Sequence, residues 1–102
     1  MVKYNYLRGK AGKGRRITVA RLVEGGLLSV GYSTCHPDDQ FNKVLGRKIA
    51  NGRLYNETEK SFSVSLSDDE QPIVKAMTTL SVVAEEFYVR EMAKEWLFQK
   101  TE

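Results

Sequence analysis

The sequence has only one cysteine, two prolines and one histidine among its 102 residues, and it contains no long apolar run. A single cysteine cannot form a disulfide within the chain, so nothing here requires an oxidising compartment. No segment reaches the roughly 18 apolar residues that cross a bilayer, and the first residues lack the apolar core of a signal peptide. We therefore expect a cytoplasmic protein without a membrane segment.

Catalytic and metal-binding motifs are missing as well. Cys35 and His36 are adjacent in the sequence, where side chains usually point in different directions, so they do not form a catalytic pair. One cysteine, one histidine and scattered carboxylates match no recognised ligand spacing for a metal. The glycine-rich residues 9–14 lack the Gly-Lys-Ser/Thr ending of a phosphate-binding loop and instead favour a hairpin loop. We expect a protein that is not an enzyme and that uses no cofactor or metal.

The amino-acid composition is typical of a single globular domain, which we expect to span residues 1–102. Hydrophobic residues make up 41% of the chain and charged residues 28%. The net charge of +3 is unevenly spread, with +6 on residues 1–34, +1 on residues 35–60 and −4 on residues 61–102. This asymmetry indicates an anionic partner on the N-terminal side, although a solvated basic strand edge would give the same pattern.

Four segments predict β-strands: residues 2–8, 16–23, 27–33 and 61–66. The first three are rich in β-favouring residues, and the fourth alternates serine with apolar side chains. Gly25 and Gly26 supply the positive φ angles that a tight hairpin turn requires. We expect the first three strands to form an antiparallel meander.

Residues 37–51 predict a short helix. Pro37 suits the first helical position because its missing N–H has no intrahelical partner there. The helix is predicted to end at Asn51, with Gly52 as a left-handed cap. An apolar stripe at spacings of three and four is predicted to pack on the sheet, and it consists of Phe41, Val44, Leu45 and Ile49.

The other side of this helix carries basic and small residues: Lys43, Gly46, Arg47, Ala50 and Arg53. Gly46 and Ala50 leave this side short of bulk, so another helix or a ligand could approach its backbone. The alternative is a tolerated surface glycine beside solvated lysines and arginines.

The C-terminal part predicts one long helix from about Glu70 to Gln99. Such a helix would be roughly 40 Å long at 1.5 Å per residue, which is more than four short strands can cover. Either the helix breaks near Thr78 and Thr79, where consecutive β-branched residues weaken it, or it pairs with the same helix of another protomer. The predicted fold is α+β: an antiparallel sheet of about four strands, one short helix and this long helix, which we expect to mediate homo-oligomerisation.

Binding of an anion is the function class that the residues support best. Arginine can grip a phosphate with two hydrogen bonds, and a flat aromatic ring can stack on a base. The candidates are Arg15, Arg16, Lys43, Arg47, Arg53, Tyr88, Arg90 and Trp96. Tyr88 and Trp96 also fit an alternative role in the core or in an interface, because they fall along the apolar stripe of the long helix.

Residues 35–54 carry a pattern that resembles a known family. They begin with Cys-x-Pro-x-Asp-x-Phe and continue to Gly-Arg-x-Ile-Ala-x-Gly-Arg. With three preceding strands and a long C-terminal helix, the chain is similar to the small bacteriophage anti-Thoeris sponge family. The motif positions with chemistry suited to phosphate are Arg47 and Arg53.

The resemblance implies a non-catalytic Thoeris inhibitor that sequesters a cyclic ADP-ribose signal in the cytoplasm of the infected bacterium. Family members are homo-oligomers, dimers or larger, that bind the intact nucleotide between protomers, and cyclic oligonucleotides are a further ligand class. The expected ligand-binding residues include four positions of the motif, Gly46, Arg47, Ala50 and Arg53. Lys43, Tyr88 and Arg90 are added for their chemistry alone, because they match no position of the motif. The alternative is a small basic phage protein that binds nucleic acid or inhibits a host defence nuclease through protein contacts.

Overall fold

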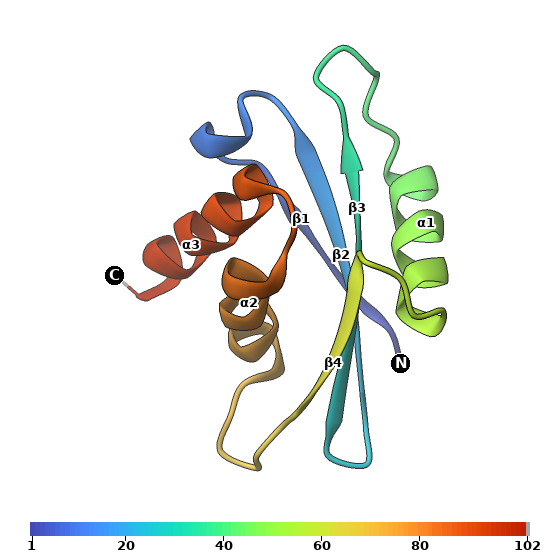
Figure 1. The fold of residues 1–102 in the computed structure, drawn as a ribbon, viewed down its shortest axis with the longest axis vertical. Helices are drawn as coiled ribbons and strands as arrows, with labels where there is room; N and C mark the ends of the chain where they lie inside the picture. Colours follow the sequence, from blue (N-terminus) through green and yellow to red (C-terminus); the bar gives the residue numbers. More distant parts are fainter. Residues whose placement is uncertain (102) are drawn as a thin grey trace.

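The computed structural model describes residues 1–101 and shows an α+β fold in three layers (Figure 1). A four-stranded antiparallel sheet with the order β1-β2-β3-β4 forms the middle layer. Helix α1 covers one face of the sheet, and α2 and α3 cover the other. The elements are β1 (Lys3–Leu7), β2 (Arg16–Glu24), β3 (Leu27–Cys35), α1 (Lys43–Tyr55), β4 (Ser61–Ser65), α2 (Pro72–Val83) and α3 (Phe87–Thr101).

The predicted meander is confirmed, and the glycine pair explains its central hairpin. Gly25 and Gly26 have φ angles of 57° and 76°, and the strands pair directly on either side of them, Glu24 opposite Leu27. Two residues with positive φ form the tight turn whose twist matches that of the flanking strands. The basic loop between β1 and β2 includes a short 3₁₀ turn at Lys10–Gly12, and Glu95 of α3 accepts a hydrogen bond from the backbone N–H of Ala11.

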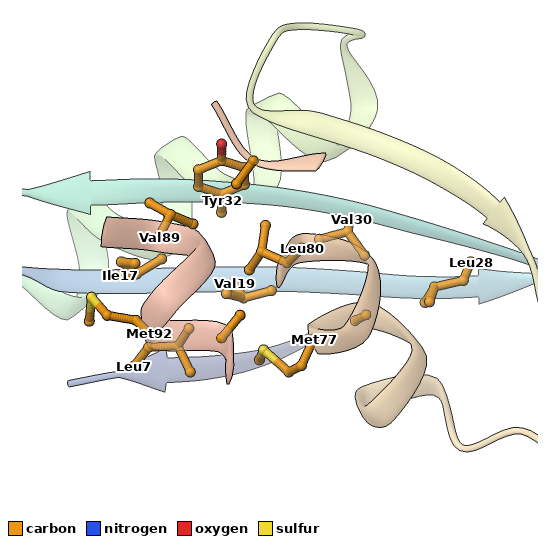
Figure 2. Close-up of a cluster of buried hydrophobic side chains, with 13 residues drawn as sticks. Leu7, Ile17, Val19, Leu28, Val30, Tyr32, Met77, Leu80, Val89 and Met92 are labelled. Atoms are coloured by element: carbon orange, nitrogen blue, oxygen red, sulfur yellow. The ribbon is translucent and has the colours of Figure 1, made fainter. Parts of the chain in front are cut away.

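Strand alternation assigns the main core to the α2–α3 face. Figure 2 shows Ile17 and Val19 of β2 and Leu28, Val30 and Tyr32 of β3, which belong to one buried cluster with side chains of the two helices. All five side chains are buried. Because neighbouring residues of a strand point to opposite faces, the intervening residues of β2 and β3 face α1.

Helix α1 begins six residues later and ends four residues later than predicted, at Lys43 and Tyr55 instead of residues 37 and 51. Asn42 caps it, because its side-chain oxygen accepts a hydrogen bond from the N–H of Leu45. Pro37 lies before the helix, in a turn closed by a hydrogen bond from Asp39 N–H to His36 O. The helix runs to Tyr55 and Gly52 is not left-handed, so the prediction of both helix ends was wrong.

The prediction of which side of α1 faces the sheet was also wrong. Ala50 is fully buried, and a Cβ atom on Gly46 would lie 2.6 Å from the Thr18 hydroxyl oxygen. The predicted apolar stripe is instead exposed, with 67% of Val44 and 53% of Leu45 accessible to solvent. Small residues allow the helix backbone to approach the sheet closely, and this contact outweighs the burial of larger side chains on the other side.

Gly31 of β3 completes this close approach from the sheet side. A Cβ atom there would collide with the backbone N of Leu54 and the carbonyl O of Ala50. The helix and the sheet therefore meet closely at two separate glycines, Gly46 of α1 and Gly31 of β3. We predicted that the small residues Gly46 and Ala50 would let another helix or a ligand approach the backbone of α1. The protein's own sheet occupies that position instead.

The C-terminal helical region is broken, at residues 84–86 instead of at the predicted pair. Thr78 and Thr79 lie inside α2, where the Thr79 hydroxyl donates a hydrogen bond to Lys75 O. The guanidinium of Arg90 donates to the carbonyl oxygens of Ala84 and Glu85, which satisfies backbone groups at the end of α2. Both helices can then lie on the same small sheet. Within residues 1–101, none of the helices combines the length and the apolar character needed to cross a bilayer.

A polar contact ties the break between α2 and α3 to the sheet. Glu86 accepts hydrogen bonds from the Tyr32 hydroxyl, at 3.0 Å, and from the ammonium group of Lys60. Burial raises the pKa of Tyr32 above its usual value of 10.0, so the phenol stays protonated and donates. Glu86 lies in the linker between α2 and α3, Tyr32 lies in β3, and Lys60 immediately precedes β4.

Candidate functional site

Three cations stand over three aromatic rings on the α1 side of the sheet. The guanidinium carbon of Arg47 lies 6.0 Å from the ring centre of Tyr4, and the ammonium of Lys43 lies 4.7 Å from that of Tyr6. The guanidinium of Arg16 lies 5.2 Å from the ring centre of Phe41, which itself meets the ring of Tyr6 edge-on. We call these residues the cation–aromatic row: Tyr4, Tyr6, Arg16, Phe41, Lys43 and Arg47.

The row follows from two matched spacings. Tyr4 and Tyr6 are two residues apart on β1, about 6.7 Å, and both point to the α1 face, opposite Ala20 and Thr18 of β2. Lys43 and Arg47 are one turn apart on α1, about 6 Å. The helix and the edge strand therefore present rings and cations at nearly the same interval.

The row keeps its positive charge. Each of its three cations faces a ring instead of a carboxylate, and the ion pairs of residues 1–101 lie elsewhere in the fold. A cation held over a ring retains its full charge, because the attraction comes from the ring quadrupole. Lys43 and Arg47 are exposed, so an anion in solution can reach them. The row can bind an anionic group.

A cleft of about 230 Å³ adjoins the row, between the start of α1 and strands β2 and β3. Arg16 and Phe41 line it and belong to the row too. The remaining lining residues are Thr18, Ser33, Thr34, Cys35, Asp39, Gln40, Asn42, Leu45, Gly46 and Ile49. The Ser33 hydroxyl donates a hydrogen bond to Gly46 O, and the hydroxyl oxygen of Thr18 is buried without a hydrogen-bond partner in the described residues.

The structure brings only part of the predicted ligand-binding set together. Lys43 and Arg47 lie in the row. Gly46 and Ala50 face the sheet, so their backbone is covered by the protein's own strands. Arg53 donates one hydrogen bond of 2.9 Å to Tyr32 O, which holds its guanidinium against β3 and not in the row.

Tyr88 and Arg90 lie on α3, which covers the opposite face of the sheet from the row (Figure 1). Tyr88 packs against the core and carries the guanidinium of Arg15 over its ring at 4.4 Å. Arg90 caps α2, and Trp96 also packs against the core. Within one protomer these residues cannot share a ligand with Lys43 and Arg47.

Sequence reasoning missed the aromatic half of the row. Because side chains alternate along a strand, Tyr4 and Tyr6 share one side of the predicted strand 2–8, but nothing in the sequence indicated that α1 would lie beside them. Phe41 was predicted to pack on the sheet as part of an apolar stripe, whereas it lies half-buried before the helix, under Arg16. The signal that could have found the site is the pairing of an alternating Tyr-x-Tyr strand with a Lys-x-x-x-Arg helix.

The side chains of Cys35 and His36 each contact backbone groups in the segment before α1. The thiol of Cys35 points to the carbonyl oxygens of His36 and Asp39, at 3.6 and 3.7 Å. Nδ1 of His36 accepts a hydrogen bond from the backbone N–H of Asp38. Among residues 1–101, no group of three His, Cys, Asp or Glu side chains is placed to hold a metal ion.

No family model, curated protein or solved structure gives a significant match to this chain.

Proposed function

We propose that this chain is a non-catalytic protein that binds and sequesters an anionic nucleotide signal, a cyclic ADP-ribose isomer, on the cation–aromatic row. The observation that carries the proposal is the row itself, in which Arg16, Lys43 and Arg47 stand over rings with no carboxylate partner among the described residues. The resemblance of residues 35–54 to the anti-Thoeris sponge family supplies the ligand class. Cyclic oligonucleotides are a second class with the same chemistry.

The row offers cations for the phosphates of a nucleotide and an aromatic ring for its base. The guanidinium of Arg47 can donate two parallel hydrogen bonds to a pyrophosphate, and Lys43 adds a point charge one helical turn away. The rings of Tyr4 and Tyr6 hold these side chains in place, which reduces the entropy that each loses when the ligand binds. Phe41 is a flat surface beside them.

Thermal unfolding with candidate ligands tests the proposal. A ligand at a hundred times its dissociation constant stabilises the folded state by about 2.7 kcal/mol. We expect this stabilisation from at least one cyclic ADP-ribose isomer or cyclic oligonucleotide, and we expect the ligand to be recovered unchanged after heating. Absence of any stabilisation at concentrations far above micromolar would refute sequestration. Recovery of a hydrolysed ligand would refute the non-catalytic part.

Arg47→Ala is the matching variant. We expect it to weaken ligand binding at least tenfold and to leave the unfolding temperature of the free protein nearly unchanged, because Arg47 is exposed. Lys48→Ala, on the outward side of the same helix, removes the same charge without touching the row and serves as the control. Oligomer mass should be the same in both variants. A fall in mass for Arg47→Ala alone would place Arg47 in an interface instead.

Nucleic-acid binding is the second candidate, and the favouring observation is the regular spacing of the row. Lys43 and Arg47 lie one helical turn, about 6 Å, apart along α1, so both can contact phosphates of one nucleic-acid strand. A nucleic-acid binder loses affinity steeply with salt, with a slope that grows with the number of phosphates contacted. A cyclic nucleotide with one pyrophosphate gives a shallow salt dependence and saturates at a fixed number of sites per protomer.

A further inference from the structure

We propose that the cleft beside the cation–aromatic row is a subsite for one nucleobase, and that the Thr18 hydroxyl supplies a hydrogen bond to the group bound there. This inference rests on the proposed function, because the row would hold the phosphates of the same ligand. The ligand would then be bound by two parts of the surface. The cleft binds a single base, and the row binds the phosphates.

The walls of the cleft suit a flat ring system. Phe41, Leu45 and Ile49 line it, and 53% of Leu45 and 37% of Ile49 remain accessible to solvent. Exposed leucine and isoleucine side chains beside a phenylalanine ring form an apolar surface that gains from being covered. A base inserted here would cover all three side chains.

The polar residues of the cleft supply the hydrogen-bonding groups. Thr18 is only 1% exposed, and its hydroxyl oxygen has no hydrogen-bond partner in the described residues. A buried hydroxyl without a partner lowers stability, whereas valine has the same shape without that cost. Ser33 donates to Gly46 O and keeps lone pairs that can accept. A ligand group that reaches Thr18 satisfies an atom that the protein leaves unpaired.

The size of the cleft limits the ligand. Sites for drug-sized ligands have volumes of about 300 to 1,000 Å³, and this cleft has about 230 Å³. At roughly 30 Å³ per water molecule, this volume corresponds to about eight waters, the scale of one ring system. The rest of a nucleotide must lie outside the cleft. Arg16 lines the cleft and also belongs to the row, so the part of the nucleotide outside the cleft would lie next to the cations of the row.

Amide NMR with two fragments separates the cleft from the row. We expect adenosine at millimolar concentration to shift the resonances of Thr34, Cys35 and Leu45. Inorganic pyrophosphate should shift those of Tyr4, Lys43 and Arg47. Pyrophosphate shifts at the row with no adenosine shifts at the cleft overturn the base subsite and leave the proposed function standing. Adenosine shifts alone support the subsite and refute anion binding at the row.

Two tryptophan variants test the cleft in the whole ligand. Leu45→Trp places a large ring at the exposed wall of the cleft, and we expect it to weaken binding of cyclic ADP-ribose at least tenfold. Val44→Trp adds the same ring at a neighbouring exposed position that does not line the cleft, and it should bind as the unmodified protein does. Equal binding by both variants overturns the subsite.

Thr18→Val tests the hydroxyl. If the hydroxyl bonds to the ligand, the variant unfolds at the same or a higher temperature yet binds adenosine at least fivefold more weakly. Unchanged adenosine binding overturns the role of Thr18. Thr18→Ser retains the hydroxyl and should retain binding, so a loss in both variants also counts against the hydroxyl. These outcomes concern adenosine alone and do not depend on the phosphate contacts of the row.

Discussion

Gly46 occupies the position where α1 comes closest to the sheet. Glycine inside a helix costs up to about 1 kcal/mol relative to alanine. The protein retains it because a Cβ atom would lie 2.6 Å from the Thr18 hydroxyl oxygen and 3.7 Å from that of Ser33. The close approach also positions Lys43 and Arg47 beside β1, so this residue shapes the candidate site without contacting a ligand.

The two glycines of α1 should therefore respond oppositely to alanine. We expect Gly46→Ala to lower the free energy of unfolding by about 1–3 kcal/mol through overpacking. Gly52→Ala should raise it by up to about 1 kcal/mol, because nothing lies within 4 Å of the added atom and its φ angle is negative. Urea unfolding of both variants measures the difference. Stabilisation by both substitutions would contradict the close contact of α1 with the sheet.

At the scale of elements, the ends of the helices depend on specific polar contacts. Asn42 begins α1, and Arg90 satisfies the carbonyl oxygens at the break between α2 and α3. The turn before α2 is closed by Glu70, whose carboxylate accepts from the backbone N–H and the hydroxyl of Ser67, each at 2.8 Å. The contact of the Glu70 side chain with the Ser67 backbone N–H is one half of a capping box, whereas the Glu70 N–H donates to the carbonyl oxygen of Ser67 and not to its hydroxyl. This turn lies ahead of the helix, and Pro72 takes the first helical position.

The contact at Glu70 makes the turn sensitive to acid. The backbone and hydroxyl bonds from Ser67, followed by that from Lys75, lower the pKa of Glu70 from 4.5 to about 2. A lowered folded-state pKa means that the charged carboxylate stabilises the folded protein above pH 4.5, and that this contribution is lost as the pH falls from about 4.5 to 2. Glu70→Gln should flatten the stability curve in this window.

An NMR titration of the Glu70 carboxyl measures the shift directly. Ser67→Ala removes the hydroxyl donor and keeps the backbone N–H, so the pKa should rise toward 4.5 without reaching it. A titration midpoint of 4.5 in the unmodified protein would show that the turn is not closed in solution.

At the scale of the whole molecule, the break between α2 and α3 changes where self-association could occur. We expected the apolar stripe of one long helix to form the interface. Met92 is buried in the protein's own core, and Tyr88 and Trp96 pack against that core. Exposed apolar side chains remain at the corner between the helices, namely Val82, Val83 and Phe87. Homo-oligomerisation remains a prediction, and this corner is the surface on which we test it.

Phe87→Glu tests that prediction, since Phe87 is 67% exposed and its substitution leaves the core intact. Light scattering should give a mass larger than one protomer for the unmodified protein and a smaller mass for this variant. Val44→Glu is the control, because it introduces the same charge at an equally exposed position on α1. A monomeric unmodified protein would refute self-association, and an effect of Val44→Glu alone would move the interface to α1.

Local patterns predicted the strands and the hairpin well, because alternation and paired glycines act through neighbouring residues. The same reasoning failed for α1. The apolar spacing of Val44, Leu45 and Ile49 indicated a buried stripe, yet the helix turns this side toward solvent. Of the predicted ligand-binding residues, Lys43 and Arg47 lie together, whereas Arg53 and Arg90 hold backbone carbonyls.

The sequence by itself determined an α+β chain with a meander of three strands, because strand alternation and positive φ angles are properties of a few consecutive residues. Only the tertiary structure decided which side of α1 meets the sheet and which rings stand under Lys43 and Arg47. That choice depends on how closely Gly46 and Gly31 let two backbones approach. The contacts that these two glycines make join residues 13 to 28 positions apart in the sequence. They are set by the packing of the whole sheet, which no local spacing encodes.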